Sequence, residues 1–502
     1  MNIDTYRLFG ANSTQIISII PHINPIYLYI IDICFEVGMG KNILFLIFII
    51  VFITACSSVA NLEELDNLYY TNGSFDKSYS YIESKPRNDF LWNFQGGVLA
   101  LQNMDYMKSI DYLNSSEKFF EDYHDKGLGN EILEGIATVL AGNGIFDYHG
   151  NLYEAVFINY YKAINYFMIG DYASSRIEFN RANDRQRRAK DFFAKKINEY
   201  SEALHDSESK YKDEAKNTNK QKTYGTANDI LESKYKNLKQ FKAYDGYINP
   251  FITYISGIFF LIQNDFNKSL DLLKEAYAVS GAKEISSDIG ILEKRKANKD
   301  SKRYTWLIIE DGRSPKKGEL RLELPLFLQD QVIYFAVALP TFVAGSKAYD
   351  NYQVKSDNNE IYNGFEISNL NSLLANELEM AIPYIVTTSI LSSSYKAYLQ
   401  YFLGNTLGTF GSIGGVIFSV ASTNADTRTA RILPFKQLVI RIENSDSSFS
   451  LIANGRILYN FKIGSDCNFL CVSKDNIIYA RILNKNISII TQNHPKTLEN
   501  SQ

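Results

Sequence analysis

The stretch from Asn151 to Lys190 constrains the fold more than any other part of this 502-residue chain. Apolar residues recur at helical spacing through its first half and resume in its second half, after a break at Gly170 and Asp171. This pattern predicts two antiparallel helices joined by a tight turn. Ala163 on the first helix and Ser175 on the second are small, so the two helices can approach each other closely. The stretch therefore predicts a helical hairpin.

The same frame of small and large residues occurs at two other places in the chain. In each copy the first small residue precedes the second by twelve positions, a large apolar residue follows four later, and a further small residue three after that. The residues of the three copies are Gly97, Tyr106, Ser109, Leu113 and Ser116, then Ala163, Tyr166, Gly170, Tyr172, Ser175, Phe179 and Ala182, and finally Gly257, Phe260, Phe266, Ser269, Leu273 and Ala276. The copies begin 66 and 94 residues apart, so we expect other helices between them.

This frame resembles the tetratricopeptide repeat, although that repeat usually recurs every 34 residues or so in tandem. The resemblance implies helical hairpins that stack side by side and leave a concave groove for an extended peptide or a partner domain. The frame residues are then structural packing positions. The first helix of the central hairpin also has positions that this packing does not use. We predict that three of them contact a partner: Asn159, Lys162 and Asn165.

The N-terminal region resembles a bacterial lipoprotein signal peptide. Lys41 precedes an unbroken apolar run over residues 43–53, and the run leads through Thr54 and Ala55 to Cys56. The resemblance implies that Cys56 is acylated and becomes the first residue of the mature protein. The run is too short for a permanent membrane span, which needs about 20 residues. We predict Met39 as the true start, and Ser57 favours sorting to the outer membrane.

The periodicity changes after the third hairpin, which predicts an α+β fold. Strands are expected at Tyr304–Ile309, Leu320–Leu324 and Val332–Leu339, and further short strands between residues 435 and 483. The predicted organisation begins with a signal region at 1–55 and a polar linker at 56–87. A tetratricopeptide-like (TPR-like) α-helical hairpin domain follows at 88–300 and includes a long charged helical pair at about 184–245. A β-containing C-terminal domain at 302–487, with a helical insertion at 369–425, and a tail at 488–502 complete the chain.

Two further stretches allow two interpretations each. The basic residues near the end of the central hairpin either bind an anionic partner or form a solvated face; they are Arg185, Arg187, Arg188, Lys190, Lys195 and Lys196. The stretch Ala397–Ala425 carries no charge. It is either a membrane segment or, as we favour, a buried or surface-adherent helical element.

The sequence predicts no catalytic site, metal or cofactor. The histidines lack ligand spacing, and the pair Glu310 and Asp311 is interpreted as the acidic side of a turn because Gly312 follows. Cys467 and Cys471 could close a small disulfide in an oxidising compartment, provided that a turn joins them. A formal net charge of −4 gives no reason to expect nucleic acid as a partner.

Several short motifs resemble an uncharacterised family of bacterial lipoproteins with TPR-like helices. They include Tyr148-His149-Gly150, Gly170-Asp171-Tyr172 and the run from Arg181 to Gln186. We therefore predict a lipid-anchored periplasmic protein of the outer membrane that serves as an interaction scaffold for an envelope protein, attached to the membrane through the lipid on Cys56. The alternatives are a regulator or assembly factor of peptidoglycan synthesis or envelope export, and an enzyme acting on cell-wall glycan.

Overall fold

The structure, a computed structural model, describes most of the chain after residue 56. The described residues are 57–71, 74–124, 148–188, a few between 226 and 238, 249–327, 332–379, 382, 425–465, 470–484 and 486–491. Several predictions fall outside them: the signal region with Met39 and Cys56, Cys467, most of the charged helical pair with Lys190, Lys195 and Lys196, and the uncharged stretch as far as residue 424.

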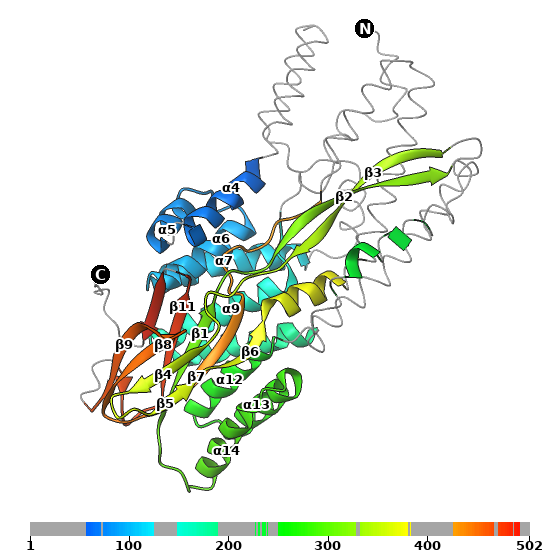
Figure 1. Cartoon of the computed structure of the whole chain (residues 1–502). Helices are drawn as coiled ribbons and strands as arrows, with labels where there is room; N and C mark the ends of the chain where they lie inside the picture. The colour runs from blue at the N-terminus through cyan, green and yellow to red at the C-terminus, as the bar shows by residue number, and fades with distance from the viewer. Residues whose placement is uncertain are drawn as a thin grey trace.

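The chain has an α+β fold, with a helical N-terminal part and a strand-rich C-terminal part, as predicted (Figure 1). The helices are α4 (Ser57–Asp66), the π-helical turn η2 (Asn67–Thr71), α5 (Phe75–Glu83), α6 (Phe90–Gln102), α7 (Tyr106–His124), α9 (Leu152–Met168), α12 (Pro250–Ile262), α13 (Phe266–Ser280) and α14 (Ile285–Lys296). Two further segments, 172–188 and 370–379, are helical as well.

Three helical hairpins stand where the repeated frame lies: α6 with α7, α9 with segment 172–188, and α12 with α13. Each turns at the residue seven positions after the first small residue of the frame. These residues, Met104, Gly170 and Asn264, all adopt a left-handed backbone, with φ of 59°, 83° and 59°. Glycine adopts that conformation without strain, so Gly170 suits its position better than the other two residues suit theirs.

The two small residues of each frame are joined by a hydrogen bond. The hydroxyls of Ser109, Ser175 and Ser269 donate to the carbonyl oxygens of Gly97, Ala163 and Gly257, at 2.6, 2.9 and 2.7 Å. A Cβ atom on Gly97 would come within 2.5 Å of Leu113, and one on Gly257 within 2.9 Å of Leu273. The small residues are therefore required by close approach of the paired helices.

The strands form two five-stranded sheets and one hairpin. They are β1 (Tyr304–Asp311), β2 (Lys316–Phe327), β3 (Val332–Val343), β4 (Tyr352–Ser356), β5 (Ile361–Asn363), β6 (Phe365–Asn369), β7 (Lys436–Glu443), β8 (Ser447–Ala453), β9 (Arg456–Gly464), β10 (Leu470–Cys471), β11 (Asn476–Ile482) and β12 (Ile487–Thr491). The first sheet has the order β12-β11-β1-β7-β6, and the second has the order β10-β9-β8-β4-β5. The first is mixed, because β1 runs parallel to β11 and antiparallel to β7.

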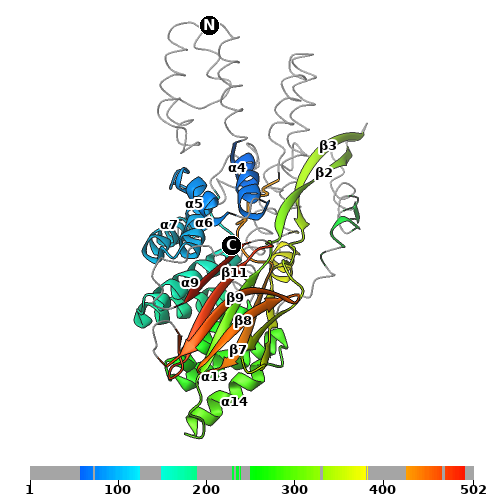
Figure 2. The same ribbon diagram turned by 60° about the vertical axis from the view of Figure 1, so that its left-hand side comes forward.

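The first sheet lies between helices and the second sheet (Figures 1 and 2). Every residue of its central strand β1 is buried. Trp306 and Ile308 join the hydrophobic core shared with the helices, whereas Leu307 and Ile309 join the core shared with the second sheet. This division follows from the alternation of side chains along a strand. One continuous core therefore links the helical part to the strand-rich part.

The structure corrects several predicted boundaries. Residues 57–83, predicted as part of a polar linker, are largely helical and contribute Leu62, Leu65 and Tyr69 to the core. The predicted tail contains most of strand β12. The predicted strand at 304–309 extends through Asp311, and β4, β5 and β6 are not among the predicted strands. Polar residues inside these segments obscured the apolar pattern.

Candidate functional site

The groove predicted between the stacked hairpins is filled by the protein's own sheet. We call α6, α9 and α12 the inner helices, and most of their residues are buried. Their partner helices α7, segment 172–188 and α13 cover one side of them, and the first sheet covers the other. Polar contacts also cross this boundary: Tyr161 on α9 donates to Glu310 on β1, and Ser488 on β12 donates to the carbonyl of Gln102 on α6. The inner helices thus offer no open groove.

The three predicted partner contacts lie inside the protein. Asn159, Lys162 and Asn165 on α9 are all buried. Asn165 donates to the hydroxyl of Ser109 at 2.8 Å and so connects the first hairpin to the second. These positions are directed at the neighbouring hairpin rather than at a partner, which corrects the prediction.

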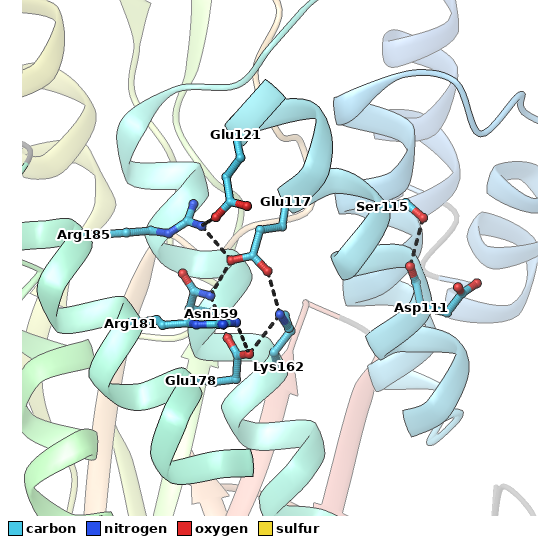
Figure 3. A network of polar contacts seen from close by, with 9 residues as sticks. All are labelled: Asp111, Ser115, Glu117, Glu121, Asn159, Lys162, Glu178, Arg181 and Arg185. Carbon is cyan, nitrogen blue, oxygen red and sulfur yellow. Dashed lines mark hydrogen bonds and ion pairs between the residues drawn. The ribbon is translucent and has the colours of Figure 1, made fainter. Parts of the chain in front are cut away.

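Asn159 and Lys162 belong to a charged cluster between α7, α9 and segment 172–188 (Figure 3). The ammonium of Lys162 lies 2.6 Å from Glu117 and 3.0 Å from Glu178, and Asn159 donates to both carboxylates at 2.8 and 2.7 Å. Arg185 adds a contact to Glu117 at 2.6 Å. Burial opposes ionisation of Glu117, but Lys162 and Arg185 outweigh it and lower the pKa of its carboxyl. The cluster therefore joins two hairpins through paired charges.

Two arginines of the basic stretch, Arg185 and Arg187, form ion pairs with acidic side chains. Arg185 also contacts Glu121 at 2.7 Å, and Arg187 contacts Glu275 on α13 at 2.9 Å. These contacts support the interpretation of a solvated, paired face rather than an anion-binding site for this part of the stretch.

Glu310 and Asp311 are buried strand residues rather than part of an exposed turn. Asp311 accepts hydrogen bonds from the backbone N–H groups of Ala348 and Tyr349 and from the hydroxyl of Tyr352. Burial raises the pKa of both carboxyls. Since their oxygen atoms are enclosed by protein donors, this pair does not present open carboxylates to a glycan.

Arg481 lies beside Glu310 and Asp311 and is not among the residues predicted from the sequence. It is fully buried in β11, and it donates to the carbonyl oxygens of Glu310 and Gly312 at 3.0 and 2.7 Å and to the hydroxyl of Tyr69 at 3.1 Å. Tyr479 and Tyr161 donate to the Glu310 carboxylate at 2.7 and 3.0 Å. The sequence feature that could have identified Arg481 is its single charge inside the otherwise apolar run from Ile477 to Ile482.

The frame residues occupy different environments. Ala163, Ser175, Phe179, Ala182 and Ala276 are buried, like the glycines and serines already described, and Tyr166 is half-buried. Tyr172 is exposed and its ring packs at 5.6 Å from that of Phe167. Gly170 has open space around it, so its left-handed turn conformation, rather than close packing, is what favours glycine there.

Each of the three outer helices carries at least one exposed large apolar side chain. Met107 on α7 is 65% exposed and Ile177 on segment 172–188 is 52% exposed. Ile169, Tyr172 and Tyr277 also have exposed side chains, and they lie on the outer helices or in the turn that leads into one. We call α7, segment 172–188 and α13 the outer helical layer. It is the side of the three hairpins that the sheet does not cover.

The second exposed feature is the β2–β3 hairpin, which we call the arm. Its two strands pair over twelve positions and extend beyond the sheets (Figures 1 and 2). On one face of the arm Leu324, Val337 and Leu339 pack with Leu374 and Leu378 of segment 370–379. Residues on the opposite face include Arg321, Glu323 and Tyr334, all exposed. Pro325 and Ala338 on this opposite face are buried, so the arm is covered on one face and partly covered on the other.

The base of the arm is tied to the N-terminal helix by a group that we call the Asp66 clamp. The Asp66 carboxylate, at the end of α4, lies 2.9 Å from Arg313, 3.4 Å from Lys316 and 3.8 Å from Arg431. Tyr70 of η2 donates to the carbonyl oxygen of Arg431 at 2.5 Å. The clamp fixes the position of α4 relative to the first residue of β2.

Cysteine and metal chemistry are limited in the part of the chain that the structure describes. Cys471 is disulfide-bonded, and its predicted partner Cys467 is not among the described residues. No group of three or more His, Cys, Asp or Glu side chains within the described ranges could hold a metal ion. Among the described helices, none combines the length and apolar character that crossing a bilayer requires.

No protein-family model, curated protein or solved structure matches this chain.

Proposed function

We propose that this protein is a lipid-anchored component of a bacterial cell envelope that binds another envelope protein through its outer helical layer. The observation that carries the proposal is the set of exposed apolar side chains on that layer, with Met107 and Ile177 the most exposed. Large apolar side chains exposed on each of three neighbouring helices offer apolar contact points to a protein that lies across the layer. Because the first sheet covers the helices α6, α9 and α12, we propose the outside of the hairpins, rather than the predicted groove, as the binding surface.

Two observations support a place outside the cytoplasm. The first is the resemblance of the N-terminal region to a lipoprotein signal peptide ending at Cys56. The second is the disulfide at Cys471, because disulfides persist in oxidising compartments and are rare in the cytosol. Acylation of Cys56 would hold the body close to a membrane, with α4 as the first helical element after the anchor.

Site-specific photo-crosslinking in cells tests the proposed surface. A photoreactive phenylalanine analogue replaces Ile177 on the outer helical layer, and a matched control replaces Ile361 of β5, which is 55% exposed on the second sheet. We expect one envelope protein to be captured from position 177 and not from position 361. Equal capture from both positions, or no capture from 177, 107 and 277, would contradict the proposal.

Palmitate labelling tests the anchor separately. The wild-type protein should incorporate labelled fatty acid and fractionate with membranes, and Cys56→Ala should do neither. Label retained by Cys56→Ala would disprove Cys56 as the acylation site.

A further inference from the structure

The arm and the N-terminal helix leave the body from the same point. The Asp66 clamp joins the end of α4 to Lys316, the first residue of β2, at 3.4 Å, and to Arg313 just before it at 2.9 Å. In both views α4 and the arm stand at the same end of the molecule, beyond the two five-stranded sheets (Figures 1 and 2). An anchor attached just before Ser57 would therefore lie at the arm's end of the molecule.

The arm is longer than α4, so its tip can reach the level of the anchor. Ten residues of α4 rise about 15 Å from the clamp to Ser57. Twelve residues of β2 extend about 40 Å when fully extended. The arm thus has more than enough length to reach a surface that lies at the start of α4.

Polarity changes along the outward face of the arm. Paired residues of antiparallel strands lie on the same face, so Glu323 and Ala336 share this face, as do Arg321 and Ala338 nearer the base. Toward the tip the described residues of β3 on this face are Tyr334, 69% exposed, and Val332, 45% exposed. The face therefore passes from charged to apolar and aromatic with distance from the body.

We infer that the tip of the arm, through Val332 and Tyr334, contacts the lipid surface to which Cys56 is anchored. This inference rests on the proposed anchoring. A bilayer changes from polar to apolar along its normal, and the arm changes in the same direction. Tyrosine is enriched at the level of lipid headgroups, where its ring lies in the apolar region and its hydroxyl in the polar region. A protein partner would not require polarity to be ordered along the length of the arm.

The experiment uses the purified, acylated full chain in vesicles of phosphatidylethanolamine and phosphatidylglycerol. Single cysteines replace Val332, Tyr334 and, as the control, Ile361, and each carries an environment-sensitive fluorophore. We expect a blue shift and several-fold stronger quenching by spin-labelled lipid at positions 332 and 334, and an aqueous spectrum at 361.

Three outcomes overturn the inference in different ways. Vesicle-bound, acylated protein with aqueous spectra at 332 and 334 excludes lipid contact by the arm and leaves the proposed function intact. A blue shift that appears only after an envelope protein extract is added assigns the arm to a protein partner. Absence of acylation at Cys56, shown by mass spectrometry of the purified protein, defeats both the anchoring and the arm contact.

Discussion

The central sheet and the arm are both built from strands, yet their surroundings differ completely. Strand β1 is buried along its whole length, between the inner helices on one side and the second sheet on the other. The arm is covered on one face and exposes Arg321, Glu323 and Tyr334 on the other. We infer that the sheet and inner helices supply the stability of the protein, whereas the arm is available for contact.

The largest effect is expected at Arg481. Arg481→Met leaves the carbonyl oxygens of Glu310 and Gly312 without their donor and leaves the Glu310 carboxylate without a cation nearby. Each buried acceptor left without its donor costs about 1–3 kcal/mol, so the several acceptors lost together should lower the unfolding free energy by about 3–5 kcal/mol. Urea denaturation followed by far-UV circular dichroism measures the loss. The matched control is Arg321→Met on the arm, where we expect a change within about 0.5 kcal/mol. Equal losses in the two variants would remove the distinction between sheet and arm.

The unfolding free energy should depend on pH through Glu377, which lies near Lys317 at the base of the arm. Burial raises the pKa of Glu377 to about 7, with Glu154 acting in the same direction and Lys317 against it. The folded state therefore retains a proton that the unfolded chain loses above its ordinary pKa near 4.5. The contribution of Glu377 to the unfolding free energy is therefore present at low pH and is lost as pH rises through about 7.

The variant Glu377→Gln cannot ionise, so it should unfold at higher urea than the wild type in alkaline buffer. We expect a gain of up to about 3 kcal/mol at roughly pH 8 that shrinks toward zero near pH 4. Glu319→Gln, on the outward face of the arm, serves as the control. A gain that does not depend on pH would mean that the carboxyl of Glu377 does not titrate as inferred.

The serines of the three hairpins should contribute free energies of the same order, with Ser109 the largest because its hydroxyl also accepts from Asn165. Ser109→Ala, Ser175→Ala and Ser269→Ala each remove one buried hydroxyl that donates to the helix across from it. We expect each to lower the unfolding free energy by about 1 kcal/mol. Thermal or urea unfolding of the three single variants measures this. If the losses of unfolding free energy differed severalfold among the three variants, the same hydrogen-bond geometry would not give the same stabilisation in each hairpin.

The smallest effect on stability is expected at the outward face of the arm. Tyr334→Ser alters a side chain that is mostly exposed, so the unfolding free energy should change by no more than about 0.5 kcal/mol. Calorimetry of the variant beside the wild type measures it. A loss as large as that of a core substitution would place Tyr334 in a packed environment and contradict its availability for lipid.

Local patterns predicted the helical hairpins and several strands well. The twelve-residue spacing between Gly97 and Ser109, repeated at Gly257 and Ser269, corresponds in each case to a hydrogen bond between paired helices. The alternation over Leu320–Leu324 corresponds to part of the arm. These features depend on neighbours close in the chain, so their period is visible in the sequence. The N-terminal helices α4 and α5 escaped prediction because polar residues interrupt their apolar positions.

The sequence by itself determined the α+β class, the three hairpin frames and the alternating strands, because each follows from the spacing of nearby residues. Only the tertiary structure decided what covers each face. It placed the sheet against the helices α6, α9 and α12, and it packed α9 against α7 and segment 172–188, which buries Lys162 between Glu117 and Glu178. It also joined Arg481 to Glu310 and Asp66 to Arg313, across long separations in the chain. Periodicity shows which face of a helix or strand is apolar, but the partner of that face is set by packing between distant segments.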